Sequence, residues 1–580
     1  MVEYSTDVLV IGSGLAGLRA TIEAKKSHVD VILVDKTFLG RGSASIYAGS
    51  VGSGVVADEP PGRHEKYLEN TFELMVRGGV DPGWDTPYLQ NQRLMMTIAV
   101  EAIGRQAELR DYGVRDPYTQ EWYAQRPLVG RQLIMPLVEY AGSIGVKTLE
   151  KTTIFDLIKK GERVIGAVGF NVDTGEFVVI KAKSTVLATG GCARIFKRTH
   201  APYRLTGDGY AMAYRAGASL WEMELSAIDM VGLDEPGLPH TWLNPSSARY
   251  KGIFRNAKGE PYFLKYAKDH NLLGPGATQS LDDSQLIRYG IPGFFEMIAM
   301  LIHFWTAAMK EIHEGRGDRG CVFLDLTRNT EDEWLKSGGG VQGLNLLRDF
   351  DWKHKWVHIQ PLILGQIGGI EMDEECRSGV KGLYVAGEAG EGHAMHHANV
   401  TGARAGRSAA IDAIFITGEP RLGTEEYAWI EDKKKMLQEI IEREVTPEGN
   451  PKEMKRRIGE IMWQYTGPLK NKENLKTALK ELEKIRKENL PKLYAKNTRQ
   501  LRESMEVINM VLVSEAVASS ALHRTESRGV HKRIDYPRRD NENWLKNVLV
   551  KQKNGKMEVY TKPVELIWSR PGPMEVLEEF

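Results

Sequence analysis

Residues 7–17 read DVLVIGSGLAG and residues 31–35 read VILVD, and these two stretches decide the fold. The first is an apolar strand that runs directly into G-x-G-x-x-G and then into a helix pattern of small residues. The second is another apolar strand, which ends in an acid. This is the order that a βαβ dinucleotide-binding unit requires. Because strand, helix and acid all occur at the expected spacing, we predict a bound dinucleotide rather than a glycine-rich turn without a ligand.

Each glycine of this unit has a physical role. Gly12 permits the tight turn, Gly14 lets backbone N–H groups approach a pyrophosphate, and Gly17 lets the helix pack closely on the strand. The helix N-terminus faces the phosphates with its partial positive charge. Asp35 lies where a carboxylate accepts hydrogen bonds from the adenosine ribose.

The composition limits the other classes of function. The chain has 580 residues, which is too many for one core, so we expect several domains. Its 77 Lys and Arg residues balance its 77 Asp and Glu residues. A net charge of zero gives no reason to expect nucleic acid as a partner.

Cysteine usage and hydropathy indicate the cellular setting. Cys192, Cys321 and Cys376 are far apart and show no C-x-x-C spacing. We therefore expect no disulfide framework, no metal site and no iron–sulfur cluster held by this chain alone. The chain begins without a secretory pattern and contains no run of 18 apolar residues, so we expect no membrane span and a cytoplasmic location.

Periodicity divides the rest of the chain. Helical patterns cover residues 86–115, 130–145, 210–217 and 402–414, and a hairpin is expected at 164–172 and 176–181. A buried strand is expected at 184–191. Residues 226–350 lose regular periodicity and have the character of an inserted domain. Residues 426–525 are charged and helical, which is typical of a bundle.

Four further motifs follow the glycine fingerprint in a fixed order: ATGG at 188–191, TGDG at 206–209, GE at 387–388 and ESRGVH at 526–531. In this order the chain resembles the flavoprotein subunits of fumarate reductase and succinate dehydrogenase, and the alpha subunit of adenylylsulfate reductase. The resemblance implies an α/β fold: a two-part, Rossmann-like FAD-binding domain, an inserted α+β capping domain and a C-terminal helical bundle. It also implies that the chain has a partner, a separate ferredoxin-like iron–sulfur subunit.

This resemblance sets the expected domain boundaries. The FAD-binding domain is expected in two parts, at residues 1–225 and 351–420. The capping domain would occupy residues 226–350 between them. The helical domain would cover 421–525 and a small C-terminal domain 526–580.

The resemblance also implies which residues contact FAD. Glu388 is the expected acceptor for the flavin ribityl chain, and Arg404 is a candidate to offset flavin negative charge. The remaining expected contacts belong to the same motifs: Gly12, Gly14, Leu15, Ala16, Gly17, Asp35, Lys36, Arg41, Gly42, Ser43, Ala188, Thr189, Gly190, Gly191, Asp208, Gly387 and Asn399.

One position predicts how the flavin is attached. Membrane-bound relatives of the fumarate reductase type tether FAD through a histidine that follows an arginine and a serine. Here Arg41 and Gly42 are followed by Ser43, which cannot make that bond. We therefore expect noncovalent FAD, as in the adenylylsulfate reductase pattern.

The expected substrate site departs from the dicarboxylate enzymes. Asp229, Leu364 and Val400 stand where the resemblance would put two histidines and an arginine, and no arginine aligns in 290–294. Of the substrate-binding residues that the resemblance implies, only Arg249 is present at its expected position. Because two carboxylates need several cationic or hydrogen-bonding groups, the substrate is predicted not to be a small dicarboxylate, unless the alignment slips in the cap.

Three residues are candidates for catalysis. His396 and His397 lie in a histidine-rich run after Glu388, and either could stabilise reduced flavin or donate a proton beside it. The alternative is a histidine satisfied by backbone carbonyls. Arg249 could bind an anionic substrate group, with a surface ion pair as the alternative.

These observations predict an FAD-dependent oxidoreductase subunit that exchanges a hydride with a small-molecule substrate and electrons with an iron–sulfur subunit. Two alternatives stay open: an electron-transfer flavoprotein subunit without its own substrate inside a larger redox complex, and an adenylylsulfate-reductase-like enzyme.

Overall fold

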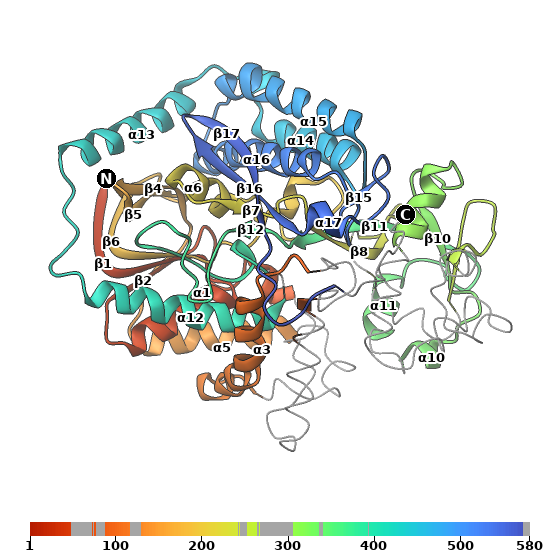
Figure 1. Ribbon diagram of the computed structural model, residues 1–580, viewed down its shortest axis with the longest axis horizontal. Helices are drawn as coiled ribbons and strands as arrows, with labels where there is room; N and C mark the ends of the chain where they lie inside the picture. Colours follow the sequence, from red (N-terminus) through yellow and green to blue (C-terminus); the bar gives the residue numbers. More distant parts are fainter. Residues whose placement is uncertain are drawn as a thin grey trace.

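Within the described residues, a seven-stranded sheet lies at the centre of the nucleotide-binding domain, with the order β3-β2-β1-β6-β5-β4 and β13 paired to β6 (Figure 1). The computed structural model describes residues 1–47, 72, 75–76, 88–115, 129–239, 241, 243, 252–263, 266, 305–335, 340–392 and 394–571. The strands are β1 (Val2–Ile11), β2 (Val31–Val34), β3 (Lys147–Leu149), β4 (Thr152–Lys160), β5 (Arg163–Asn171), β6 (Phe177–Leu187) and β13 (Leu383–Val385).

The parallel half of this sheet carries the predicted dinucleotide-binding unit. β1 pairs in parallel with β2 and β6, and β13 pairs in parallel with the end of β6. β2, β13 and the Val8–Ile11 end of β1 are apolar and buried, as expected for strands buried on both faces. The pairing brings the carboxyl ends of β1 and β13 to the same edge of the sheet, with β6 between them, although the two strands are far apart in sequence.

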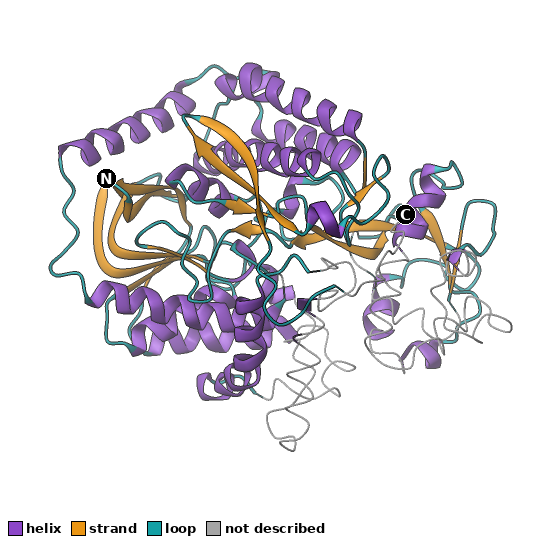
Figure 2. Ribbon diagram, in the orientation of Figure 1, coloured by secondary structure: helices purple, strands orange, loops and turns teal. Residues whose placement is uncertain are grey.

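Helices cover one face of the sheet, as Figure 2 shows. They are α1 (Leu15–Lys26), α3 (Gln92–Ala107), α5 (Val129–Ser143) and α12 (Met395–Ile414). Two glycines explain how closely α12 packs on α1. A Cβ on Gly402 would lie 2.5 Å from the Ala16 carbonyl oxygen, and one on Gly406 would lie 2.1 Å from that of Ala20.

A second sheet forms the core of the capping region. Its order is β8-β11-β10-β9, and every neighbouring pair is antiparallel. The strands are β8 (Ser226–Leu233), β9 (Ile253–Arg255), β10 (Val322–Asp325) and β11 (Val357–Gln366), with short helices α10 (Glu331–Leu335) and α11 (Gly340–Leu346) nearby. β11 lies beyond residue 350 and still pairs with β8, so this sheet extends past the boundary that periodicity indicated.

The helical bundle covers the other side of the nucleotide-binding domain (Figure 1). Its helices are α13 (Thr424–Glu442), α14 (Pro451–Thr466), α15 (Lys472–Lys484) and α16 (Thr498–His523), and α6 (Asp208–Ala216) packs against α16. The chain ends with α17 (Asn541–Trp544) and the hairpin β16 (Lys546–Lys553) and β17 (Lys556–Pro563). β7 (Leu220–Trp221) and β12 (Gly369–Ile370) extend the hairpin's sheet, and β14 (Leu469–Lys470) pairs with β15 (Lys532–Arg533).

One of the helices in the described part of the chain, α16, is long and apolar enough to cross a bilayer by composition alone. However, 72% of its apolar window is buried inside the protein. Its apolar faces pack against α14, α15 and α6, so α16 is the core helix of the bundle.

Candidate cofactor and substrate site

The turn between β1 and α1 has no room for a side chain at Gly12 or Gly17. Gly12 has a φ of +107°, and a Cβ there would lie 2.3 Å from the Ala188 carbonyl oxygen. A Cβ on Gly17 would lie 1.8 Å from the Gly12 carbonyl oxygen. Gly14 is the N-cap of α1, so no side chain caps this helix, and its first turn carries no acid. The positive end of α1 is therefore available for an anionic group.

Asp35 connects this turn to the loop after β2. Its Oδ2 accepts hydrogen bonds from the Ser13 backbone N at 3.0 Å and the Ser13 hydroxyl at 2.6 Å. Its Oδ1 accepts from the Thr37 backbone N at 2.7 Å and the Thr37 hydroxyl at 2.8 Å. These four donors fix the carboxylate at the carboxyl end of β2, beside the glycine-rich turn.

The next residue, Lys36, lies half-buried in a charged network. Its Nζ lies 2.6 Å from Asp208, 3.1 Å from Glu506 and 3.2 Å from the Thr206 hydroxyl. Burial would lower the pKa of this amine, but the two carboxylates outweigh it and raise the pKa. Lys36 therefore stays charged and joins the nucleotide-binding domain to helix α16.

Ser43 lies against the same turn, because a Cβ on Gly14 would be 3.3 Å from the Ser43 Cβ. Its hydroxyl is buried and has no hydrogen-bond partner. A Cβ on Gly42 would lie 2.4 Å from the Thr37 hydroxyl, and the Arg41 guanidinium lies 5.9 Å from the Phe38 ring centroid. The loop thus presents one unsatisfied hydroxyl next to the positive end of α1.

Glu388 closes the opposite side of the site. It lies in the turn Gly387–Ala389, and a Cβ on Gly191 would be 2.2 Å from its Oε1. The Gln366 backbone N donates to Oε1 at 3.0 Å, and the Tyr210 hydroxyl donates to the Glu388 carbonyl oxygen at 2.5 Å. Only glycine at 191 leaves room for this carboxylate as placed.

His396 and His397 occupy the first turn of α12. Their ring centroids are 4.6 Å apart in an edge-to-face arrangement. His396 is 2% exposed, neither of its ring nitrogens has a hydrogen-bond partner, and burial lowers its pKa to about 4. The alternative of a histidine satisfied by backbone carbonyls therefore does not describe His396. His393 lies outside the described residues.

The described parts of these loops present buried polar atoms that have no partner. They are the hydroxyls of Ser43 and Thr189, both ring nitrogens of His396 and the amide oxygen of Asn399. Buried polar groups are normally paired, so each such atom needs an explanation. The loops converge, because a Cβ on Gly387 would lie 2.8 Å from the Ala16 Cβ. A polar cofactor such as FAD fits this set of unsatisfied groups.

Other predicted site residues have different surroundings. Arg404 pairs with Glu101 at 2.6 Å and with Glu375 at 2.8 Å, so protein carboxylates already neutralise its guanidinium. Arg249 lies outside the described residues. Asp229 is on β8, where its backbone pairs with that of Leu362 on β11.

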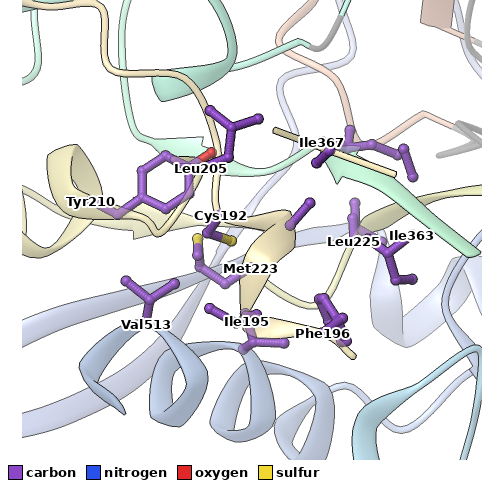
Figure 3. Close-up of a cluster of buried hydrophobic side chains, with 14 of the residues drawn as sticks. Cys192, Ile195, Phe196, Leu205, Tyr210, Met223, Leu225, Ile363, Ile367 and Val513 are labelled. Carbon is purple, nitrogen blue, oxygen red and sulfur yellow. The ribbon is translucent and has the colours of Figure 1, made fainter. Parts of the chain in front are cut away.

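Two positions where the resemblance would put a histidine and an arginine carry apolar side chains. Val400 is fully buried and Leu364 is half-buried. Figure 3 shows part of the hydrophobic core, a buried cluster to which Cys192, Tyr210 and Met223 belong. Burial raises the pKa of the Cys192 thiol well above its usual range. This environment favours Cys192 as a packing residue rather than a redox thiol.

Two polar residues were not found from the sequence. The Gln366 side chain donates to the carbonyl oxygens of Met223 and Leu225 at 2.8 and 2.9 Å, and accepts from the Ser226 hydroxyl at 3.0 Å. Glu391 is 2% exposed and accepts from the Asn91 backbone N at 2.7 Å. Two signals in the sequence could have found them. Gln366 is a glutamine inside an apolar strand, and Glu391 is an acid three residues after Glu388.

These features define a flavoprotein with a Rossmann-like domain, an inserted cap and a helical bundle. The chain belongs to the FAD binding domain family, which it matches over residues 7–405, and residues 455–575 match the C-terminal region of fumarate reductase flavoproteins. It is an FAD-dependent oxidoreductase of the fumarate reductase flavoprotein type. The expected family, fold class and cofactor are thereby confirmed.

Relatives and solved structures agree with this assignment. The chain is 28% identical to an uncharacterized FAD-dependent oxidoreductase of Methanocaldococcus jannaschii, over 94% of this chain and 96% of that protein. It is also 28% identical to the 8-methylmenaquinol:fumarate reductase flavoprotein subunit of Wolinella succinogenes, over 97% of this chain and 91% of that protein. The relatives that are named as subunits belong to complexes of several chains.

Among solved structures, the flavoprotein of E. coli quinol fumarate reductase superposes with a TM-score of 0.83 at 22% identity, covering 99% of both chains. Adenylylsulfate reductase of Archaeoglobus fulgidus superposes with a TM-score of 0.75 at 22% identity, covering 98% of this chain and 97% of that one. At this identity both likenesses concern the fold alone.

Proposed function

We propose that this chain holds FAD noncovalently between its amino-terminal βαβ unit and the segment near residue 387, and passes electrons between a substrate and a separate iron–sulfur subunit. The observation that carries the proposal is the set of buried, partnerless polar atoms on the loops and at the start of α12, which converge around the turn after β1. Bound FAD would supply the two-electron acceptor. We further propose a cytoplasmic location and membership of a larger redox complex.

Residues of different chemistry would bind different parts of the cofactor. The backbone N–H groups after Gly14 and the positive end of α1 would bind the pyrophosphate. Asp35 would accept from the ribose in exchange for the Ser13 or Thr37 hydroxyl, and Glu388 would hold the polar chain that leads to the flavin ring. His396 has a pKa lowered by burial, so it stays neutral at pH 7 and can donate one N–H and accept at its other ring nitrogen.

Noncovalent attachment follows from Ser43. A serine hydroxyl beside the turn after β1 can donate a hydrogen bond to the cofactor, but it cannot form the histidyl bond of the tethered relatives. Acid precipitation of the purified holoprotein tests this. We expect the yellow chromophore to remain in the supernatant, whereas a coloured pellet would contradict noncovalent binding.

The substrate is proposed to be something other than a small dicarboxylate. Two buried or half-buried apolar residues, Val400 and Leu364, stand where dicarboxylate recognition needs cationic groups. The same observation favours a second candidate, an electron-transfer flavoprotein subunit without its own substrate. A sulfur-anion substrate, as in adenylylsulfate reductase, requires a cationic pocket. Among the predicted site residues, Arg249 is the candidate cation for such a pocket.

Assays with a reduced dye separate these candidates. The holoprotein is offered fumarate, then sulfur oxyanions, then acyl-CoA compounds. Oxidation of the reduced flavin by one class identifies an enzyme of that class, and no response to any of them favours the relay. Rapid turnover with fumarate would overturn the substrate proposal.

A variant pair tests the proposed role of His396. His396→Gln keeps one donor and one acceptor but removes the imidazole, and we expect FAD to be retained while turnover falls by about 10²-fold or more. His354→Gln is the matched control, because His354 is exposed and pairs with the exposed Asp351. Unchanged turnover in His396→Gln would exclude a catalytic role.

A further inference from the structure

Gln366 carries a buried amide beside the proposed cofactor site, and the proposed chemistry does not use it. It is the last residue of β11 and is fully buried. Its Nε2 donates to the Met223 and Leu225 carbonyl oxygens at 2.8 and 2.9 Å. Its Oε1 accepts from the Ser226 hydroxyl at 3.0 Å and lies 3.8 Å from the Cys192 thiol, a weak donor. Both N–H groups and both lone pairs of the amide therefore have partners.

This set of partners requires an amide. Two carbonyl oxygens lie against one end of the side-chain group and two hydrogen donors against the other, and a primary amide satisfies all four contacts. A carboxylate of the same length would place negative charge against the two carbonyl oxygens. Because buried polar groups are costly to leave unpaired, these contacts hold the Gln366 side chain in one arrangement.

The same residue holds the Glu388 carboxylate through its backbone. The Gln366 backbone N donates to Glu388 Oε1 at 3.0 Å. The next backbone N, that of Ile367, donates to the Leu225 carbonyl oxygen at 3.0 Å. The end of β11 is thus attached to residues 223–226 on one side and to Glu388 on the other.

Two glycines show how closely this segment is packed. A Cβ on Gly368 would lie 2.1 Å from the Glu222 carbonyl oxygen, and one on Gly369 would lie 2.3 Å from that of Gly390. Both neighbours are backbone atoms. The segment after β11 therefore cannot shift without moving either the connection into the capping sheet or the turn that carries Glu388.

We propose that Gln366 is a positioning residue for the cofactor: its side-chain amide fixes the end of β11, so that its backbone N–H holds the Glu388 carboxylate in the orientation that binds FAD. This inference rests on the proposed function, in which Glu388 holds the polar chain that leads to the flavin ring. A carboxylate oriented before the ligand arrives loses less freedom on binding. Because residues 223–226 lead into β8, FAD binding would also depend on the first strand of the capping sheet.

A double-mutant cycle tests this role through the affinity of the full-length chain for FAD, measured by titration after the flavin has been removed. Gln366→Met keeps the length of the side chain but removes its hydrogen bonds, and Glu388→Gln removes the carboxylate that Gln366 would orient. Gln92→Met is the matched control. Gln92 is also buried and its amide also pairs with backbone atoms, but these belong to residues 567–569.

We expect Gln366→Met to weaken FAD binding at least about tenfold in the wild-type background, but less than about twofold in the Glu388→Gln background. Gln92→Met should stay within about twofold of the wild type. Equal losses in both backgrounds, or a loss of the same size in Gln92→Met, would mean that Gln366 supports only the fold, and would overturn the positioning role. Unchanged affinity in Gln366→Met would overturn it as well.

Ser226→Ala is the milder variant, and it decides the question where Gln366→Met does not fold. It removes only the hydroxyl that donates to Gln366 Oε1, so we expect FAD binding to weaken about threefold while Glu388 is present and to be unaffected in Glu388→Gln. No effect, or the same effect in both backgrounds, would contradict the proposal. Wild-type affinity for FAD in Glu388→Gln itself would instead contradict the role of Glu388 in the proposed function.

Discussion

Two glycines, Gly17 and Gly104, lie inside helices, but the structure gives them opposite requirements. A Cβ on Gly17 would lie 1.8 Å from the Gly12 carbonyl oxygen, which is fixed backbone. A Cβ on Gly104 in α3 would meet nothing within 4 Å. We predict that Gly17→Ala abolishes FAD binding and destabilises the chain, while Gly104→Ala stabilises it by about 0.5–1 kcal/mol. FAD content and melting temperature check both variants, and normal FAD content in Gly17→Ala would contradict the close packing.

The buried side chain of Glu391 predicts that the stability of the chain depends on pH. Burial raises its pKa to about 8, well above the value of about 4.5 for an exposed glutamate. Between these two values the folded chain keeps a proton that the unfolded chain releases, so the wild type loses stability as pH rises. Glu391→Gln removes this loss. We expect its melting temperature to exceed that of the wild type at pH 8.5, and the gap to shrink toward pH 5.

The full effect of Glu391 corresponds to up to about 5 kcal/mol, at about 1.4 kcal/mol per unit of pKa. Glu565→Gln is the control, because this exposed carboxylate pairs with Arg93 and its pKa is lowered rather than raised. A gap that stays constant from pH 5 to 8.5 in Glu391→Gln would show that Glu391 is ionised throughout.

At the scale of elements, Glu506 attaches α16 to the nucleotide-binding domain. It is 2% exposed, and pairing with Lys36 and Lys455 outweighs burial and lowers its pKa to about 2. Glu506→Gln leaves two cations without their shared partner, and we expect a cost of about 3–5 kcal/mol at pH 7. The wild type loses this stabilisation as pH falls from about 4.5 toward 2, so the difference should narrow in acid.

Melting temperatures at pH 7 and pH 4 measure that difference. Glu503→Gln serves as the control, because Glu503 is half-buried one turn away and does not pair with Lys36 or Lys455 within the described residues. An equal cost for the two glutamine variants would exclude a special role for Glu506 between the domains.

Elements with a strong local pattern were predicted well. The βαβ unit, the hairpin of β5 and β6 and the helical bundle all lie where periodicity placed them. The predicted strands at 176–181 and 184–191 are one strand, β6, because it pairs with β5 at one end and with β13 at the other. The helix expected at 402–414 begins at Met395, so His396 and His397 are helical.

At the scale of the whole molecule, the site could be predicted only where chemistry follows from local sequence. The glycine positions are dictated by backbone contacts between neighbours in one motif. The partners of Arg404 come from residues 101 and 375, and those of Gln366 from residues 223–226, so only the tertiary fold brings them together. Buried polar networks of this kind have no periodic signature, which is why Gln366 and Glu391 escaped notice.

Arg524 joins three distant parts of the molecule. Its guanidinium is completely buried and pairs with Glu224 at 2.6 Å, Glu526 at 3.0 Å and Glu222 at 3.1 Å. It also donates to the Lys546 carbonyl oxygen at 2.9 Å. Glu222 and Glu224 lie on the connection into the capping sheet, and Lys546 begins the C-terminal hairpin. One cation therefore pairs with buried acids from the cap connection and from the segment after α16, and burial raises the pKa of Glu222 to about 8 despite that pairing.

Arg524→Met should consequently be among the most damaging substitutions in the chain, costing about 3–5 kcal/mol or more, because it leaves buried carboxylates unpaired. Adding Glu222→Gln and Glu224→Gln removes two of those carboxyl groups, so the triple variant should be more stable than the single one. Arg456→Met is the matched control, since Arg456 pairs with acids on the surface of α14 and should cost under about 1 kcal/mol. Thermal melts of the holoprotein rank the variants, and a triple variant less stable than Arg524→Met would mean that packing, rather than unpaired charge, dominates the cost.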